Sequence, residues 1–152
     1  MKYDILKLIP VLALVFLTGC ASWKSPVSKI DETPAVFPDY KDVTVPCNIA
    51  PLNFMVEDAG HIQATLTLDG GEALNVTGKD GIIRIPERKW HDMLSVAKGK
   101  SITVTVSVWS EEYPEGVAYE PFNIHVAAEE IDPWISYRLI EPGYEGWSQI
   151  GI

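Results

Sequence analysis

Cysteine is scarce in this chain: two of its 152 residues are cysteine, Cys20 and Cys47. Two thiols cannot build a disulfide framework or supply the four ligands of an all-cysteine zinc site. Basic residues are also few, since 12 Lys and Arg stand against 21 Asp and Glu, with a formal net charge of −9. Binding to phosphates needs clustered Lys and Arg that displace counterions. The sequence therefore predicts that nucleic acid is not a partner.

The motifs that carry common enzyme chemistry are missing. The sequence contains no G-x-S-x-G nucleophile elbow, no phosphate-binding loop and no H-E-x-x-H zinc motif. His61, His91 and His125 each lack a second His or Cys at metal-ligand spacing. The acidic run 111–115 lacks the alternating carboxylates of a calcium loop and predicts a solvated turn. We therefore expect a protein that is not an enzyme and that needs no cofactor or metal.

Long hydrophobic runs are absent except for one stretch near the N-terminus. Residues 8–17 form a ten-residue apolar run, which is half of the roughly 20 residues needed to span a bilayer. The pattern predicts a secretory signal peptide over residues 1–19. The sequence Leu17-Thr18-Gly19-Cys20 resembles the bacterial lipobox, which implies cleavage before Cys20 and lipidation of that residue. The alternative is an ordinary signal peptide in which Cys20 falls by chance.

Lipidation of Cys20 would attach the protein to a membrane without spanning it. Removing residues 1–19 takes away two lysines and one aspartate, which leaves 10 basic and 20 acidic residues, net −10. Acyl chains, not surface charge, would then hold the protein at anionic headgroups. No acidic residue directly follows Cys20. An aspartate there is the usual mark of inner-membrane retention in lipoproteins, so we expect the outer membrane, on its periplasmic face.

Cys47 would then remain as the free thiol of the mature chain. One interpretation is a small buried hydrophobe in a strand, because unpaired cysteine is among the most buried residue types. The other interpretation is a redox or intermolecular thiol.

The rest of the chain divides into a tether and a β-rich domain. Residues 20–41 have the composition of a flexible tether, with three prolines, scattered charges and no apolar period. Over residues 42–129 the pattern changes to the alternation of half-buried strands. Asp69-Gly70-Gly71 and Asp80-Gly81 lie between predicted strands and are typical of hairpin turns. The predicted strands span residues 43–47, 52–56, 61–68, 73–77, 82–85, 102–108 and 122–126.

One short helix is expected after Pro86, which suits a first helical turn because its missing N–H costs nothing there. Four apolar residues follow at i, i+3, i+4 and i+7 before a terminating Gly99; they are Trp90, Met93, Leu94 and Ala97. The predicted fold is all-β: an immunoglobulin-like or fibronectin type III-like two-sheet sandwich of about seven strands with one short helix. The Cys…Trp…Cys hallmark of true immunoglobulin domains is absent, so this class is inferred from the pattern alone.

Aromatic residues gather at two places. Trp109, Tyr113 and Tyr119 flank the acidic loop, where rings beside carboxylates could stack on sugar faces. The second group lies in the C-terminal segment, residues 130–152, and consists of Trp134, Tyr137, Tyr144 and Trp147. Aromatic side chains are enriched at protein interfaces, and the alternative for this segment is packing against its own sandwich. Both groups are candidate binding residues.

Two stretches, residues 48–54 (NIAPLNF) and 137–147 (YRLIEPGYEGW), resemble the N-terminal region of large outer-membrane lipoproteins of Gram-negative gut anaerobes. Those proteins are described as TolB-like β-propeller proteins, and some carry a c-type haem. The resemblance spans roughly residues 40–152. It implies that a propeller domain would follow, so that this chain would be a truncated member. No C-x-x-C-H motif is present, so no haem is expected and no functional residue is carried over.

The predicted function is recognition rather than catalysis. A lipid-anchored, non-catalytic β-sandwich would act as a binding or scaffold module in the cell envelope, with a protein or the missing propeller as its partner. The alternative is a surface carbohydrate-binding module that uses Trp109, Tyr113 and Tyr119. A hydrolytic enzyme is a third hypothesis, and it would need facing carboxylates that the sequence does not place.

Overall fold

The structure is a computed structural model, and it describes residues 25–69, 71 and 73–136. In chain order, the elements of that part are β1 (Ser28–Ile30), β2 (Val36–Phe37), β3 (Val43–Val45), β4 (Phe54–Val56), β5 (His61–Leu68), β6 (Leu74–Lys79), β7 (Ile82–Ile83), α2 (Glu87–Ala97), β8 (Ser101–Trp109), β9 (Val117–Tyr119) and β10 (Phe122–Val126). The strands form a seven-stranded sheet, sheet A, and a three-stranded sheet, sheet B. Two sheets and, within the described residues, a single short helix confirm the predicted all-β sandwich.

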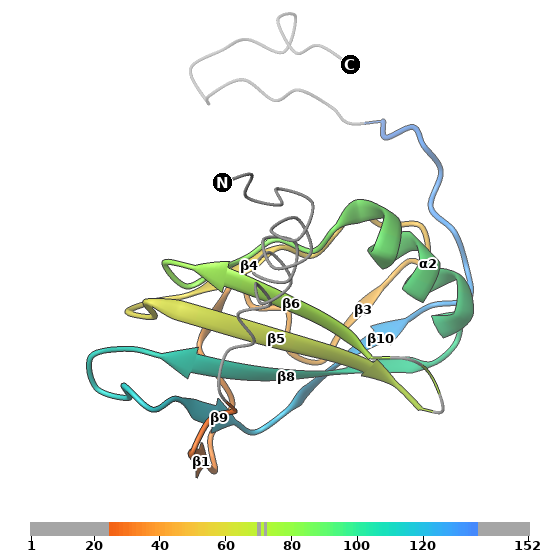
Figure 1. Cartoon of the computed structure of the whole chain (residues 1–152). Helices are drawn as coiled ribbons and strands as arrows, with labels where there is room; N and C mark the ends of the chain where they lie inside the picture. Colours follow the sequence, from red (N-terminus) through yellow and green to blue (C-terminus); the bar gives the residue numbers. More distant parts are fainter. Residues whose placement is uncertain (1–24, 70, 72, 137–152) are drawn as a thin grey trace, which may run out of the picture.

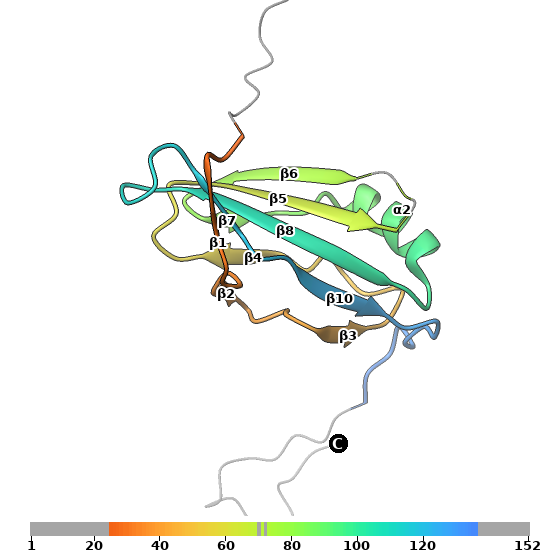
Figure 2. The same ribbon diagram turned by 90° about the horizontal axis from the view of Figure 1, so that it is seen from below.

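Sheet A is built around the long strand β8, which pairs along both edges (Figure 1). On one edge β5 runs antiparallel to it, from His61 opposite Trp109 to Leu68 opposite Ile102, and β6 pairs in turn with β5. The other edge is shared, because β10 pairs with the first half of β8 and β9 with its last residues. The N-terminal strand β1 pairs in parallel with β9. Strand β3 pairs in parallel with β10 (Figure 2).

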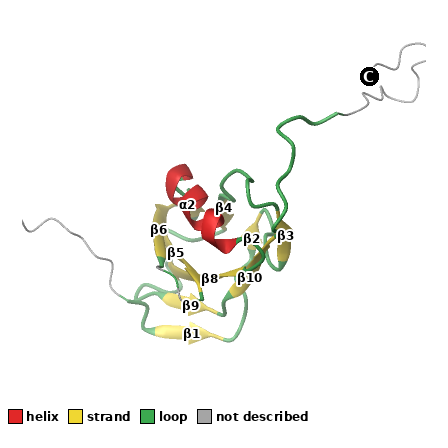
Figure 3. Cartoon of the chain, turned by 90° about the vertical axis from the view of Figure 1, so that its right-hand side faces the viewer, coloured by secondary structure: helices red, strands yellow, loops and turns green. Residues whose placement is uncertain are grey.

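Sheet B and α2 together cover one face of sheet A (Figure 3). Sheet B has the order β2-β4-β7, and its two- and three-residue strands are too small to cover sheet A alone. The helix completes the layer by burying its predicted stripe, Trp90, Met93, Leu94 and Ala97. Trp90 is 0% exposed, and its indole Nε1 donates a hydrogen bond to the carbonyl oxygen of Ile49 at 3.0 Å. Gly99, with a φ of 71°, follows the helix as predicted.

The alternating sequence places one face of sheet A in the core. The inward residues of β5 and β8 are nearly all fully buried, among them Ile62, Ala64, Leu66, Ile102, Val104 and Val106. Most of the positions between them carry hydroxyl side chains, such as Thr65 opposite Thr105. A slip of one residue would turn the apolar set toward solvent, so burial itself fixes the register.

The predicted tether over residues 20–41 is wrong for most of its described part. Residues 28–37 contribute β1, which pairs with β9, and β2, which pairs with β4. Pro34 and Val36, the first residue of β2, are buried. Lys29 in β1 forms an ion pair of 2.7 Å with Glu120, which follows β9. The sandwich therefore begins at residue 28, not at residue 42. Strands of two or three residues are too short to show an alternating period, so the sequence pattern could not reveal them.

The turn at Asp80-Gly81 also differs from the prediction. A hairpin there would pair β6 with β7, but β7 pairs with β4 in sheet B, so the chain crosses between the sheets at this turn. Gly81 has a φ of 69°, and its carbonyl oxygen accepts a hydrogen bond from the Val56 N–H at 2.9 Å. By contrast, the turn at residues 69–71 does join an antiparallel pair, β5 and β6, as predicted.

The chain joins and leaves the sandwich at opposite ends. Just before β1, the Val27 N–H donates to the carbonyl oxygen of Gly116 at 3.2 Å. We call the end of the sandwich at which this contact lies the Gly116 end. β9 and β10 then lead from there to the Val126 end, where the Ala127 N–H donates to the carbonyl oxygen of Val45 at 2.8 Å. Ten residues of extended chain cover roughly 30 Å. Figure 2 shows the chain entering at β1 and leaving after β10 on opposite sides of the sandwich.

Candidate functional site

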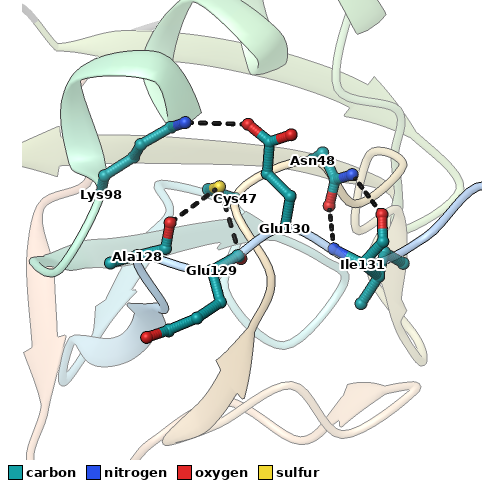
Figure 4. Close-up of polar contacts among 7 residues, drawn as sticks. All are labelled: Cys47, Asn48, Lys98, Ala128, Glu129, Glu130 and Ile131. Carbon is teal, nitrogen blue, oxygen red and sulfur yellow. Dashed lines mark hydrogen bonds and ion pairs between the residues drawn. The ribbon is translucent and has the colours of Figure 1, made fainter.

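The chain leaves the Val126 end through a set of contacts that we call the exit clamp: Cys47, Asn48 and Lys98 against residues 128–131 (Figure 4). Asn48 makes the most directional contacts of the exit clamp, two hydrogen bonds with the backbone of Ile131. Its Nδ2 donates to the carbonyl oxygen of Ile131 at 2.8 Å, and its Oδ1 accepts from the Ile131 N–H at 3.0 Å. A side-chain amide that hydrogen-bonds to both the N–H and the carbonyl oxygen of one residue makes the same pair of bonds as a neighbouring β-strand. The sandwich therefore holds the chain as far as Ile131, two residues beyond the predicted boundary at 129.

Cys47 lies beneath the clamped segment. It is buried, and its N–H donates to the carbonyl oxygen of Glu129 at 3.4 Å. Its thiol donates to the carbonyl oxygens of Glu129 and Ala128, at 3.5 Å and 3.6 Å. These contacts support the interpretation of Cys47 as a buried residue, although it lies two residues after β3 and not within a strand.

Lys98 closes the clamp from the end of α2. Its Nζ lies 3.0 Å from Glu130 Oε1. The hydrogen bond with Glu130 is the main cause that raises the pKa of Lys98, and the proximity of Cys47 adds to it. Both side chains of the ion pair are exposed, and exposed pairs contribute little to stability. Asn48, with its two hydrogen bonds, is therefore the residue expected to set the direction of the exit.

Large apolar side chains directly after the exit clamp are exposed to solvent. Trp134 and Ile135 are both 87% exposed, and Ile131 is half-exposed. Of the four aromatic residues predicted in the C-terminal segment, the structure describes Trp134; Tyr137, Tyr144 and Trp147 lie outside the described residues. For Trp134 the structure shows an exposed position and not one in its own core.

The second predicted group of aromatic residues is placed differently. Trp109 is 8% exposed, and Gly116 (φ 86°) packs against its indole so closely that a Cβ there would overlap the ring. Tyr113 and Tyr119 are half-buried against the core. A hydrogen bond with Glu112 raises the pKa of Tyr113, and burial raises the pKa of Tyr119, so both phenols stay neutral near pH 7. With Trp109 only 8% exposed, little of its ring is accessible for a sugar to stack on.

A wide hollow of about 950 Å³ lies beside Trp109 at the Gly116 end. Four exposed carboxylates line it, those of Asp58, Asp80, Glu111 and Glu112. Within residues 25–69, 71 and 73–136, no group of three or more His, Cys, Asp and Glu side chains could hold a metal ion. The acidic residues at 111, 112 and 115 are exposed, as a solvated turn requires.

His61 is buried at the inner wall of this hollow. Its ring lies 5.3 Å from the Trp109 ring, between centroids. Burial lowers the pKa of His61, a backbone hydrogen bond with Gly78 opposes the shift, and the positive charge of Lys79 adds to it. The neutral imidazole is therefore the form that the fold accommodates.

The lowered pKa of His61 predicts that the protein loses stability as the pH falls. Above pH 6.5, about the pKa of histidine in an unfolded chain, His61 is neutral in both the folded and the unfolded state, and its titration takes nothing from the free energy of unfolding. Below that pH the unfolded chain binds a proton that the folded chain does not bind, so the free energy of unfolding falls. Melting temperatures measured from about pH 7.5 down to pH 5.5 should decline in the native protein, with a shallower slope in His61→Gln. His91→Gln, at an exposed position on α2, is the control and should keep the slope. Equal slopes in the native protein and in His61→Gln would contradict the assignment.

Cys20 lies outside the described residues. No helix in the part of the chain that the structure describes is long and apolar enough to cross a membrane. Comparisons with protein-family models, with curated proteins and with solved structures found no match to this chain, so the resemblance to TolB-like lipoproteins stays a prediction.

Proposed function

We propose that this protein is a lipid-anchored envelope protein whose β-sandwich is a non-catalytic scaffold that presents its C-terminal segment, residues 130–152, to a protein partner. The observation that carries the proposal is the position of Trp134 and Ile135, both 87% exposed and only three and four residues after the clamped Ile131. Exposed large apolar side chains mark surfaces that a partner covers. The proposed location is the periplasmic face of the outer membrane, through acyl chains on Cys20.

The opposite positions at which the chain enters at β1 and leaves after β10 support this proposal. With β1 in the sandwich, Val27 is the seventh residue after Cys20, so at most about 25 Å separates the two. An acylated Cys20 would therefore keep the Gly116 end near the membrane. The Val126 end would lie roughly 30 Å further out. The C-terminal segment would thus leave the scaffold on its far side, where a partner could reach it.

The exit clamp supports a binding role because it orders the chain before any partner arrives. Ordering a loop or a long side chain at an interface costs free energy, and an element that is already fixed avoids that cost. The bonds from Asn48 fix the backbone at Ile131, close to the exposed indole of Trp134. The carbohydrate-binding alternative has no comparable support, because Trp109 is buried. The resembled family suggests a propeller domain as one class of partner.

Photo-crosslinking in intact producing cells tests the proposal. A photoreactive benzoylphenylalanine in place of Trp134 keeps an aromatic side chain at the exposed position and should give a discrete intermolecular adduct on illumination. Asn48→Ala in the same background removes two hydrogen bonds, each of about 1 kcal/mol. It should lower the adduct yield severalfold while the sandwich stays folded, as measured by circular dichroism.

The matched control places benzoylphenylalanine at Val96, which is 59% exposed on α2 and lies outside the C-terminal segment. This position should give no discrete adduct. Equal adducts from positions 96 and 134, or none from position 134, would argue against a partner at the C-terminal segment.

A further inference from the structure

The outer face of sheet B carries three apolar side chains in one line, which we call the apolar row. Phe37 on β2 lies opposite Met55 on β4, and Met55 lies opposite Ile82 on β7. Phe37 is 68% exposed, Ile82 is 37% exposed and Met55 is partly exposed. Neighbouring strands lie about 4.8 Å apart, so the row forms a continuous strip across the full width of the sheet.

The outer face of sheet A is different in kind. Its solvent-facing positions on β5 and β8 carry polar side chains, including Thr65, Thr67, Thr103 and Thr105. An exposed apolar row is therefore not a general property of the outer faces of this sandwich. Single exposed apolar residues are ordinary, whereas adjoining ones indicate a surface that something covers.

We infer that the apolar row is the docking site for residues 137–152 of the same chain when no partner is bound. This inference depends on the proposed function and deepens it, because it names what the C-terminal segment contacts before a partner takes it. The sixteen residues hold seven large apolar side chains, those of Tyr137, Leu139, Ile140, Tyr144, Trp147, Ile150 and Ile152.

The exit clamp places the start of this segment within reach of the row. Ile131 is bonded to Asn48, and Met55 follows Asn48 by seven residues, so at most about 25 Å separates Asn48 from the row. The 21 residues from 132 to 152 extend over about 70 Å. Figure 3 shows the chain leaving beside β3, on the side of the molecule where β2 and β4 lie.

Charge and size favour this occupant over two others. The net charge of −10 after removal of residues 1–19, from 10 basic and 20 acidic residues, opposes contact with an anionic membrane surface. A second copy packed through three side chains would bury far less than the roughly 1,200 Å² of a stable interface. A segment of the same chain acts at a high effective concentration, about millimolar for a short flexible connection, so a small apolar surface is enough to hold it.

An intramolecular crosslink tests the inference without any partner. The purified mature protein is reconstituted at low density in vesicles of phosphatidylethanolamine and phosphatidylglycerol, with benzoylphenylalanine at position 37. Illumination should join position 37 to residues 137–152 at the mass of one chain, as mapped by peptide mass spectrometry. The same probe in place of Thr65, on the outer face of sheet A, is the control and should not link to that segment.

A crosslink between two chains, a lipid adduct or no link to residues 137–152 would overturn the inference.

Hydrogen exchange gives a second measurement that needs no probe. Phe37→Ser, a change at an exposed position, should raise the exchange rates of amides in residues 137–152 roughly tenfold, and unchanged rates would also overturn it. If instead the proposed function is wrong, benzoylphenylalanine at position 134 gives no intermolecular adduct in cells. That result is separate from the intramolecular crosslink of position 37.

Discussion

Replacing Cys20 with serine is expected to abolish lipid attachment of this protein completely. In the proposed lipoprotein the acyl groups would be carried by the thiol and the new amino group of Cys20, and a serine hydroxyl cannot form the thioether. Each buried methylene contributes about 0.8 kcal/mol to membrane binding, and stable anchoring needs more than one chain. Cells fed labelled palmitate should incorporate label into the native protein and none into Cys20→Ser, which should also retain residues 1–19 when its mass is measured.

Cys47→Ser is the matched control for this prediction. Cys47 is the second cysteine of the chain, and its thiol is buried beneath the exit clamp, where a lipid-transferring enzyme cannot reach it. This variant should keep the full palmitate label and the shortened mass. Absence of label from the native protein, or equal label in Cys20→Ser, would overturn the lipoprotein assignment and with it the proposed location.

Replacing Trp90 with alanine is expected to cause the largest loss of stability of any single substitution in α2. The side chain is 0% exposed, and truncating a buried tryptophan costs about 3–5 kcal/mol through lost burial and the cavity left behind. The change also removes the hydrogen bond from Nε1 to the carbonyl oxygen of Ile49. For a domain of this size the loss corresponds to a decrease in melting temperature of roughly 10–20 °C.

Thermal or urea unfolding followed by circular dichroism measures this effect. Trp134→Ala makes the same chemical change at a position that is 87% exposed, and it should alter the free energy of unfolding by less than about 0.5 kcal/mol. If both variants lost stability equally, Trp134 would belong to a folded core. If neither did, α2 would not complete the second layer of the sandwich as described.

Much of the sandwich could be predicted from local patterns. The alternation in β5, β8 and β10 predicted strands with one buried face, and the structure places Ile62, Val104 and Ile124 in the core. The stripe headed by Trp90 predicted α2 and the face that it buries. These features are readable because a period of 2 or 3.6 residues reflects one local geometry repeated along the chain.

The candidate site could be predicted only in part. Sequence reasoning named Trp134 but missed Asn48 and Lys98, which lie 83 and 32 residues from their partners in the clamp. No spacing rule connects residues that far apart, and a single asparagine after a strand is most often a turn residue. For Trp109 a stacking role was predicted, and the structure places the indole inside the fold because β8 continues to that residue.

The sequence by itself determined the strand periods, the helix stripe, the acidic charge and the lipobox-like tetrapeptide, because each depends on residues that are close together in the chain. The tertiary structure alone decided that β1 and β2 join the sheets, that the chain crosses to sheet B at Gly81, and that Phe37, Met55 and Ile82 align in one row. It also decided that the chain leaves at the end opposite to where it joins. These features arise from pairing between distant segments, whose choice depends on which surfaces remain to be buried once the local elements have formed.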